Sequence, residues 1–440
     1  MESVGRREAK GGRRTAAGFV AAWLAASALN ASEIVLTNGA RVVVEERSAS
    51  ETVAVRLLVG GGQLDEPDGR HGVADLHAAL LLRGTRQKTG FALARAGEEL
   101  GGRLTSRARA AAESIAIEVP AENAEPAIRL AIETFLSPKF EEADLAKEKA
   151  LLAGSLATAR DDPKTLLDDA FYRTLFPSHA LARLASLTDA ELRPIRIEDV
   201  RAFHRSRLDA GRLALIAVGR CSSARVESLA RELLGPLPAG ARSGAPRLAR
   251  VLSPPPPLPE SVRRRVSHRT TQPTLVIGLP TVGLPDRERP AFLLLRHVLA
   301  GFDERLYSEI REKRGYAYWV RTEGLQLPEA GAFGISTGAK EKYFPEIERI
   351  LRQELSRISA QPISAEELKR AVRYARTAEA REDETNPGRV GVIANDLAEG
   401  APVRSYDERV ARLSAVTPEE IRELARRLFE GKHVAVVSLY

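Results

Sequence analysis

The stretch that decides the fold runs from Arg70 to Thr85 and reads R-H-G-V-A-D-L-H-A-A-L-L-L-R-G-T. It follows an apolar segment, residues 53–62, which ends in three glycines and is predicted to be a β-strand. Apolar residues at helical spacing predict a helix over Gly72–Arg83, and Gly84 is a typical residue to end it. The first unit that the sequence predicts is therefore a strand followed by a short helix with one apolar face.

Length and composition limit the class of protein. A chain of 440 residues is too long for one ordinary hydrophobic core, so two or more domains are expected. Hydrophobic residues make up 44% and charged residues 28%, which is typical of a globular protein rather than a disordered or membrane one. Much of the net charge of +7 lies before residue 15. The sequence has no zinc knuckle, RNA-binding aromatic motif or long basic stripe, so no nucleic-acid partner is expected.

Residues 1–31 are predicted to be a signal peptide. A basic stretch ends at Arg14, an apolar run covers residues 15–28, and small residues offer cleavage after Ala28 or Ala31. The run is shorter than the roughly 20 residues that span a bilayer, so membrane association is expected only if the segment stays uncleaved. The predicted location is periplasmic. The single Cys221 can form no disulfide within the chain, which leaves the redox compartment open.

The second half of the chain repeats the predicted elements of the first half. The paired segments, first half then second half, are 53–59 and 274–280, 72–83 and 289–299, 115–119 and 332–337, 124–136 and 344–358, and 141–158 and 364–376. The final helix 417–429 and strand 433–439 are matched with helix 223–234 and strand 212–218, in reversed order. The sequence therefore predicts two copies of one domain.

The predicted fold class is α+β, with two tandem homologous domains at residues 32–235 and 260–440. A proline-rich linker, 236–259, joins them and contains four consecutive prolines. Each domain, of about 200 residues, has an ordinary size. Each is expected to hold an antiparallel-rich sheet with helices packed on one face. A hairpin is predicted at Asn38-Gly39, between two β-branched runs.

Several motifs in fixed order carry a family resemblance. They are G-V-A and L-L-L-R-G-T within 72–85, F-E-E-A-D-L-A-K-E-K at 140–149, D-D-P at 161–163, R-L-Y-S-E-I-R-E-K-R-G-Y-A-Y at 305–318 and I-S-A-E-E-L-K-R-A at 363–371. From Glu33 to Tyr440 the chain resembles the insulinase/pitrilysin family of zinc peptidases, the inverzincins, and within it the short bacterial branch related to mitochondrial processing peptidase. The resemblance implies the metallopeptidase fold of LuxS and the processing peptidases.

The resemblance places the family's zinc site at positions where this chain has other residues. Active members carry His-x-x-Glu-His, in which both histidines bind zinc and the glutamate acts as general base. The corresponding positions here are Asp75, Ala78 and Ala79, and the third ligand, a glutamate, is replaced by Ser155. The comparison implies that ligands and base are all lost. No cofactor is expected in this chain, and zinc is expected in a partner subunit.

A rearranged metal site is an alternative. His71, Asp75 and His77 are close in sequence and can all bind a metal. His71 and Asp75 lie four residues apart and could share a helix face, whereas His77 points elsewhere, and no glutamate base follows. The competing interpretation is that both histidines are solvent-exposed or hydrogen-bonded near the start of a helix.

A second family motif is retained and gives the functional hypothesis. Arg311 and Tyr318 in R-E-K-R-G-Y-A-Y match the residues that the family uses to bind substrate backbone and stabilise the tetrahedral intermediate. The alternative is that Arg311 pairs with a carboxylate and Tyr318 is a half-buried strand residue. The resemblance implies a non-catalytic, substrate-binding subunit, inactive alone, of a heterodimeric zinc metalloendopeptidase that cuts unfolded peptides. It would supply this pair in trans to a zinc-bearing homologous subunit.

Two other functions stay open at this point. One is a structural or peptide-binding protein of the same fold with no role in proteolysis. The other is an active peptidase that uses the rearranged metal site. The three hypotheses differ in whether Arg311 and Tyr318 affect turnover and in whether the chain alone holds zinc.

Overall fold

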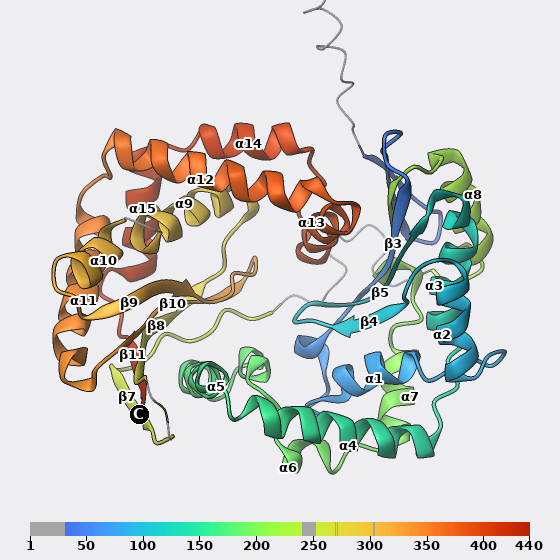
Figure 1. Ribbon diagram of the computed structural model, residues 1–440, viewed down its shortest axis with the longest axis horizontal. Helices are drawn as coiled ribbons and strands as arrows, with labels where there is room; N and C mark the ends of the chain where they lie inside the picture. Colours follow the sequence, from blue (N-terminus) through green and yellow to red (C-terminus); the bar gives the residue numbers. More distant parts are fainter. Residues whose placement is uncertain (1–30, 240–251, 269, 271, 302–303) are drawn as a thin grey trace, which may run out of the picture.

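The computed structural model describes residues 31–239, 252–268, 270, 272–301 and 304–440. The predicted signal peptide, apart from Ala31, lies outside the described residues, as does the middle of the predicted linker. Within the described part of the chain, no helix has the length and apolarity needed to cross a membrane. The chain forms two halves, each built around one sheet (Figure 1).

The first sheet has six strands in the order β1-β2-β6-β3-β5-β4. Their bounds are β1 Ser32–Val35, β2 Arg41–Glu46, β3 Thr52–Gly60, β4 Thr105–Ala108, β5 Ala112–Pro120 and β6 Leu213–Gly219. All neighbours are antiparallel except β2 and β6, which run parallel. The hairpin predicted at Asn38-Gly39 is confirmed, with Gly39 at a φ of 95° that glycine adopts readily.

The second sheet has five strands in the order β7-β11-β8-β10-β9. Their bounds are β7 Val262–Val266, β8 Thr274–Val282, β9 Ala317–Glu323, β10 Ala330–Ala339 and β11 Ala435–Leu439. Only β7 and β11 run parallel, as β2 and β6 do in the first sheet. The two sheets therefore share one strand order, with β1 added to the first. The predicted α+β class with two tandem homologous domains is confirmed.

The helices of the first half are α1 Val73–Leu81, α2 Gly90–Glu99, α3 Ala124–Leu136, α4 Glu142–Ala159, α5 Pro163–Leu175, α6 Asp189–Leu192, α7 Ile197–Arg205 and α8 Ser223–Leu234. Those of the second half are α9 Arg289–Ala300, α10 Arg305–Tyr307, α11 Phe344–Ala360, α12 Ala365–Glu384, α13 Asn386–Glu399, α14 Tyr406–Ser414 and α15 Pro418–Phe429. Side chains cap two of these helices: Asp162 accepts hydrogen bonds from the first turn of α5, and Ser364 forms a capping box with Glu367 on α12.

The predicted reversed order of the last helix and strand is wrong. In both halves a helix precedes the strand that enters the middle of the sheet: α7 precedes β6, and α15 precedes β11. Each of these helices packs against the first helix of its own half, α1 and α9 respectively. The element order is thus the same in both halves, and α8 is an addition to the first half.

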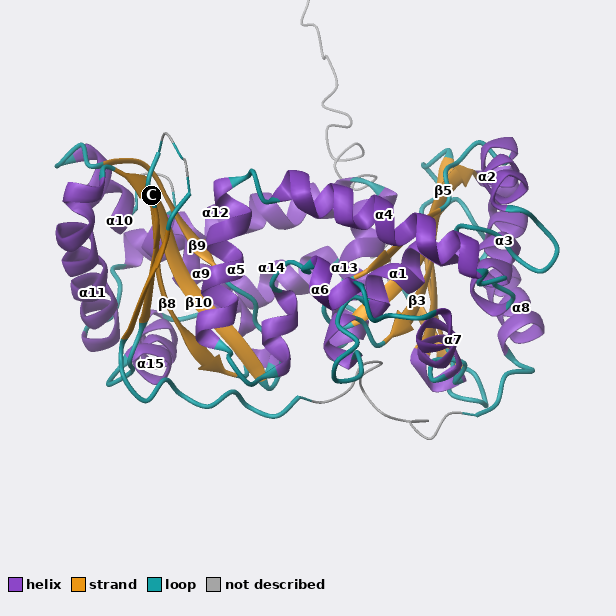
Figure 2. Ribbon diagram, turned by 90° about the horizontal axis from the view of Figure 1, so that it is seen from below, coloured by secondary structure: helices purple, strands orange, loops and turns teal. Residues whose placement is uncertain are grey.

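The expectation of helices on only one sheet face is also wrong. Helix α5 of the first half packs on the second sheet, against β8 and β11, and α13 of the second half packs on the first sheet, against β3 and β6 (Figures 1 and 2). All seven residues of β6 are buried, because its apolar side chains have cover on both faces. The halves therefore exchange one helix each, and two of the hydrophobic clusters contain residues from both halves.

Candidate functional site

The predicted zinc positions lie on α1. This helix begins after Gly72, and the N–H groups of Gly72 and Ala74 donate to Glu66 Oε1 at 2.9 and 3.0 Å. Burial raises the pKa of Asp75, and its carboxylate accepts a hydrogen bond from Gln63 Nε2 at 3.2 Å. Ala78 is buried at 3% exposure. The face of α1 that carries the predicted site therefore presents one engaged acid and a methyl group.

The remaining two positions offer no ligand either. Ala79, on α1, is half-buried and has no donor atom beyond its main chain. Ser155 lies exposed on α4, which packs against α1, and its Oγ donates to the Leu152 carbonyl of the same helix at 2.8 Å. Among the described residues, no group of three or more histidine, cysteine, aspartate or glutamate side chains could hold a metal ion.

The three residues of the alternative metal site have separate partners. His71 contacts Glu191 Oε1 through Nδ1 at 3.1 Å and the Arg183 carbonyl through Nε2 at 2.9 Å. His77 is fully buried and points into the core of the first half. Both histidines are hydrogen-bonded, as the competing interpretation expected, but solvent exposure is the wrong description of His77.

His77 is the centre of a buried hydrogen-bonded chain that links three elements. Its Nδ1 lies 2.8 Å from Glu113 Oε2 on β5, and its Nε2 lies 3.0 Å from His204 Nδ1 on α7. Burial, together with the neighbouring His77, lowers the pKa of His204 to about 3, so His204 is neutral near pH 7. Each ring nitrogen of His77 thus has one partner, and which nitrogen donates depends on the tautomer of the ring. Three phenylalanine rings surround the pair: Phe135, Phe140 and Phe203.

Sequence reasoning missed this chain, although a signal for it exists. Glu113 shares its strand face with Ile115, Ile117 and Val119, which are buried, so an acid at that position needs a buried partner. His77 likewise falls within the apolar stripe of α1. Glu113 on β5 and His77 on α1 are polar residues at positions where the apolar pattern predicts burial. That pattern could have indicated a buried polar pair.

The retained pair lies at the start of β9 in the second half. Arg311 belongs to a π-helical turn, Ser308–Glu312, that follows α10. Its Nη1 donates to the main-chain carbonyl of Tyr318 at 3.1 Å and to the hydroxyl of Tyr307. The Tyr318 side chain is 76% exposed. Neither half of the alternative matches this geometry, because Arg311 contacts tyrosine oxygens and Tyr318 is not half-buried.

Buried side chains anchor the segment 305–313, which contains α10 and the π-helical turn, to the core of the second half. Leu306 and Ile310 are fully buried, and the N–H of Lys313 donates to the Ser308 carbonyl at 3.0 Å across the π turn. π-helical turns inside α-helices occur frequently at functional sites. The nearby carboxylate of Glu309 is bound by Lys313 and Arg314, which lower its pKa. Arg311 is thus the cation of this segment that faces solvent without a carboxylate partner among the described residues.

Within one chain the two predicted sites are far apart in the architecture. The residues of α1 belong to the core of the first half, whereas Leu306 and Ile310 belong to that of the second half. Figure 1 shows α1 and α10 on opposite sides of the molecule. The structure therefore does not bring Asp75 together with Arg311 and Tyr318.

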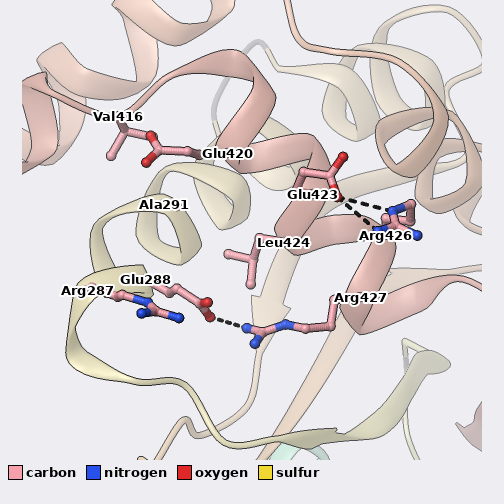
Figure 3. Close-up of a pocket in the computed structure, with 9 residues that line it drawn as sticks. All are labelled: Arg287, Glu288, Ala291, Val416, Glu420, Glu423, Leu424, Arg426 and Arg427. Atoms are coloured by element: carbon pink, nitrogen blue, oxygen red, sulfur yellow. Dashed lines mark hydrogen bonds and ion pairs between the residues drawn. The ribbon is translucent and has the colours of Figure 1, made fainter.

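A separate surface cavity of about 510 Å³ lies between α9 and α15 (Figure 3). Its walls carry paired charges: Arg427 binds Glu288, and Arg426 binds Glu423 at 3.0 Å. Ala291 and Leu424 also line it. None of the predicted site residues lines it, so it does not extend the site described above.

Comparison with known proteins identifies the family. Residues 41–188 match the family model described as insulinase (peptidase family M16), and residues 194–374 match the model described as peptidase M16 inactive domain. The chain belongs to the M16 peptidase family. This confirms the predicted family. The second match begins before the predicted linker, so the predicted domain boundaries stay a prediction.

Relatives of this M16 chain are similar over nearly their whole length. A protein of Streptomyces coelicolor named an uncharacterized zinc protease is 26% identical over 408 residues, covering 89% of this chain and 85% of the relative. A Mycobacterium tuberculosis protein of the same description is 25% identical over 417 residues, covering 94% of each chain. These relatives support the family assignment along the length of the chain.

Solved structures show the same fold. A peptidase M16 inactive domain from Pseudomonas fluorescens superimposes with a TM-score of 0.82 at 21% identity, covering 93% of this chain and 98% of the other. A protease from Helicobacter pylori gives a TM-score of 0.81 at 17% identity, covering 93% and 99%. These likenesses establish the architecture, and the chemistry of the site rests on its own residues.

Zinc, the metal implied by the family, does not fit the residues of this chain. Structural and catalytic zinc sites need at least three nitrogen, sulfur or oxygen side-chain ligands. Alanine has none, Ser155 turns its hydroxyl to its own helix, and Asp75 is a single carboxylate. No step of a hydrolytic reaction is therefore assigned to a metal in this chain.

Proposed function

We propose that this M16 chain is the non-catalytic, substrate-binding subunit of a heterodimeric zinc metalloendopeptidase. It places Arg311 and Tyr318 at the active site of a zinc-bearing homologous subunit. One observation carries the proposal: an exposed Arg311–Tyr318 pair is present in a chain whose zinc positions hold Asp75, Ala78 and Ala79. Both donors are therefore accessible to a substrate or to a second subunit.

The chemistry of the pair suits a role in trans. A guanidinium and a phenol are both hydrogen-bond donors, and such donors stabilise the negative oxygen that develops when water attacks a peptide carbonyl. The guanidinium group of arginine is also a delocalised cation whose planar fork of donors suits oxygen acceptors. Zinc held by the partner would supply the activated water. This chain would bind the peptide backbone and stabilise the oxyanion.

The substrate is an unfolded peptide, since the pair recognises main-chain groups that folded proteins keep within their secondary structure. The predicted signal peptide would deliver the subunit to the periplasm. There it would meet a homologous subunit exported in the same way.

The test is reconstitution. Residues 32–440 are mixed with an M16 chain of the same organism that carries an intact His-x-x-Glu-His motif. Cleavage of a fluorogenic peptide of about 12 residues is followed, because isolated helices of that length are only marginally stable in water. Each chain alone should be inactive, and the assembled pair should cleave. Cleavage by the zinc-bearing chain alone, unchanged on adding this chain, would exclude the proposed function.

Single substitutions test whether Arg311 and Tyr318 contribute to the turnover of the reconstituted pair. Arg311→Ala and Tyr318→Phe in this chain should each lower kcat/KM at least tenfold while the two chains still associate, since removing one oxyanion donor typically costs about 10²–10³ in kcat. Arg321→Ala is the control, because Arg321 is an exposed arginine on β9, the strand that carries Tyr318. A loss with Arg321→Ala as large as that with Arg311→Ala would show a general charge effect and contradict the proposed role.

A further inference from the structure

We propose that Tyr307 is a positioning residue that aims the Arg311 guanidinium at the substrate. The inference rests on the proposed function, because it assigns the residue that prepares Arg311 for its role. Tyr307 lies four residues before Arg311, at the end of α10 and the start of the π-helical turn. It precedes the R-E-K-R-G-Y-A-Y motif and is not part of it.

Two contacts join Tyr307 to Arg311. The Tyr307 hydroxyl accepts a hydrogen bond from Arg311 Nη1, and Arg311 Cζ lies 4.9 Å from the centroid of the Tyr307 ring. A guanidinium close to an aromatic ring is also attracted to it electrostatically. The same Nη1 donates to the Tyr318 carbonyl at 3.1 Å. Arg311 is therefore held between the two tyrosines, through one nitrogen.

Burial makes Tyr307 a fixed reference point. Its side chain is 8% exposed, and its neighbours Leu306 and Ile310 are fully buried in the core of the second half. Arg311 is exposed, and an exposed arginine side chain samples many rotamers. A hydrogen bond from Arg311 to a tyrosine that is itself packed in the fold selects one of these rotamers before substrate arrives, which is how preorganised sites are built.

The contact with Tyr307 uses only one of the three guanidinium nitrogens of Arg311. Nη1 is used twice, whereas Nε and Nη2 donate to no acceptor among the residues that the structure describes. The guanidinium is a planar fork, so fixing Nη1 also fixes the direction of the other N–H groups. These groups are the donors available to a peptide carbonyl or to the developing oxyanion.

Tyr307→Phe tests the inference because it keeps the ring and removes only the hydroxyl. We expect kcat/KM of the reconstituted pair to fall about tenfold, mainly through kcat, with association and unfolding temperature unchanged. Tyr316→Phe is the matched control: it removes a hydroxyl from the same segment, and Tyr316 stacks on Tyr343 at 4.3 Å rather than on Arg311. Unchanged kcat in Tyr307→Phe, or an equal loss in Tyr316→Phe, would overturn the inference.

A double variant separates positioning from structure. If Tyr307 acts through Arg311, Tyr307→Phe should cause no further loss once Arg311→Ala is present. Additive losses would show that Tyr307 acts independently, and would overturn the inference.

The two proposals fail in distinguishable ways. If Arg311→Ala lowers kcat but Tyr307→Phe does not, only the positioning role is lost. If Arg311→Ala itself leaves kcat unchanged, the proposed function fails as well.

Discussion

The ring of Phe171 lies on Gly334, a residue from the other half of the chain. A Cβ built at Gly334 would lie 2.9 Å from Phe171 Cζ, and one built at Gly278, which pairs with Gly334 across β8 and β10, would lie 2.5 Å from the same atom. Phe171 belongs to α5 of the first half and is 2% exposed. Gly278 and Gly334, on adjacent strands, thus leave a flat surface on the second sheet. The Phe171 ring packs on this surface and so connects the two halves.

A side chain added at Gly334 should weaken the packing between the two halves. Gly334→Ala should lower the free energy of unfolding by about 1–3 kcal/mol, the usual cost of overpacking a core, because the buried Phe171 ring has to move. Urea unfolding measures the change. Gly154→Ala is the control: no atom lies within 4 Å of its Cβ position, and alanine in a helix should stabilise by up to about 1 kcal/mol. A Gly334→Ala chain as stable as the wild type would contradict this account of the junction.

The exchanged helices should make the halves unfold together. Helix α13 covers Ala54 and Ile216 of the first sheet with Val390 and Ile393, and these side chains would face water in an isolated half. We expect one calorimetric transition for residues 32–440, and aggregation of residues 32–235 expressed alone because of the exposed apolar face. Two well-separated transitions, or a stable and monomeric isolated half, would show that the exchange contributes little.

The buried histidine pair should make stability depend on pH. The folded chain keeps His204 neutral down to a pKa of about 3, whereas an unfolded histidine titrates near 6.5. Between these values the unfolded chain binds more protons, so this contribution to stability rises with pH, by about 1.4 kcal/mol per unit at most. His204 faces Glu113 only through His77, and the positive charges of Arg205 and Arg207 oppose its protonation further.

The variant His204→Phe separates the contribution of His204 to the pH dependence of stability from the opposite contribution of Glu66. Burial raises the pKa of Glu66 to about 7, so its contribution falls as pH rises from about 4.5 to 7. The stability of His204→Phe should therefore fall less than that of the wild type between pH 6.5 and 4.5, as measured by urea unfolding at each pH. His433→Phe, at an exposed position, should follow the wild type. Parallel pH profiles for wild type and His204→Phe would refute the assignment.

Zinc analysis tests whether the family's metal site is lost in this chain. After dialysis, the purified chain should hold well under one zinc per molecule, because Ala78 and Ala79 have no ligand atom and His71 and His77 already have partners. Elemental analysis measures the content. Close to one tightly held zinc would mean that His71, Asp75 and His77 rearrange to bind it, and would restore the alternative of an active peptidase.

Much of the fold could be predicted from the sequence because local signals were strong. The Asn38-Gly39 turn and the helical spacing of apolar residues before Gly84 each specify structure within a few residues. The repeated order of elements then gave two similar halves. The exchange of α5 and α13 could not be predicted this way, because which sheet a helix covers depends on contacts between residues more than 100 positions apart, such as Phe171 and Gly334.

The residues of the candidate site also fall into those that sequence motifs indicate and those that only the folded structure shows. Arg311 and Tyr318 were found because they sit in one short motif, and Asp75 with its neighbours because a motif shows where ligands are missing. Glu113, His77 and His204 come from three elements, and only the folded chain shows that they are in contact. Tyr307 lies in the longer motif 305–318, ahead of the R-E-K-R-G-Y-A-Y part, and the role proposed for it depends on the π-helical turn, which local sequence does not specify.

The most direct measurement of the central claim is the kcat of the reconstituted pair at saturating peptide, with Arg311→Ala and Tyr318→Phe combined in this chain. The account predicts an assembled heterodimer that binds its full complement of zinc in the partner and turns over at least a hundredfold more slowly than the wild-type pair. The same assembly with an unchanged kcat would contradict it, and would leave this M16 chain a structural or peptide-binding relative with no part in the reaction.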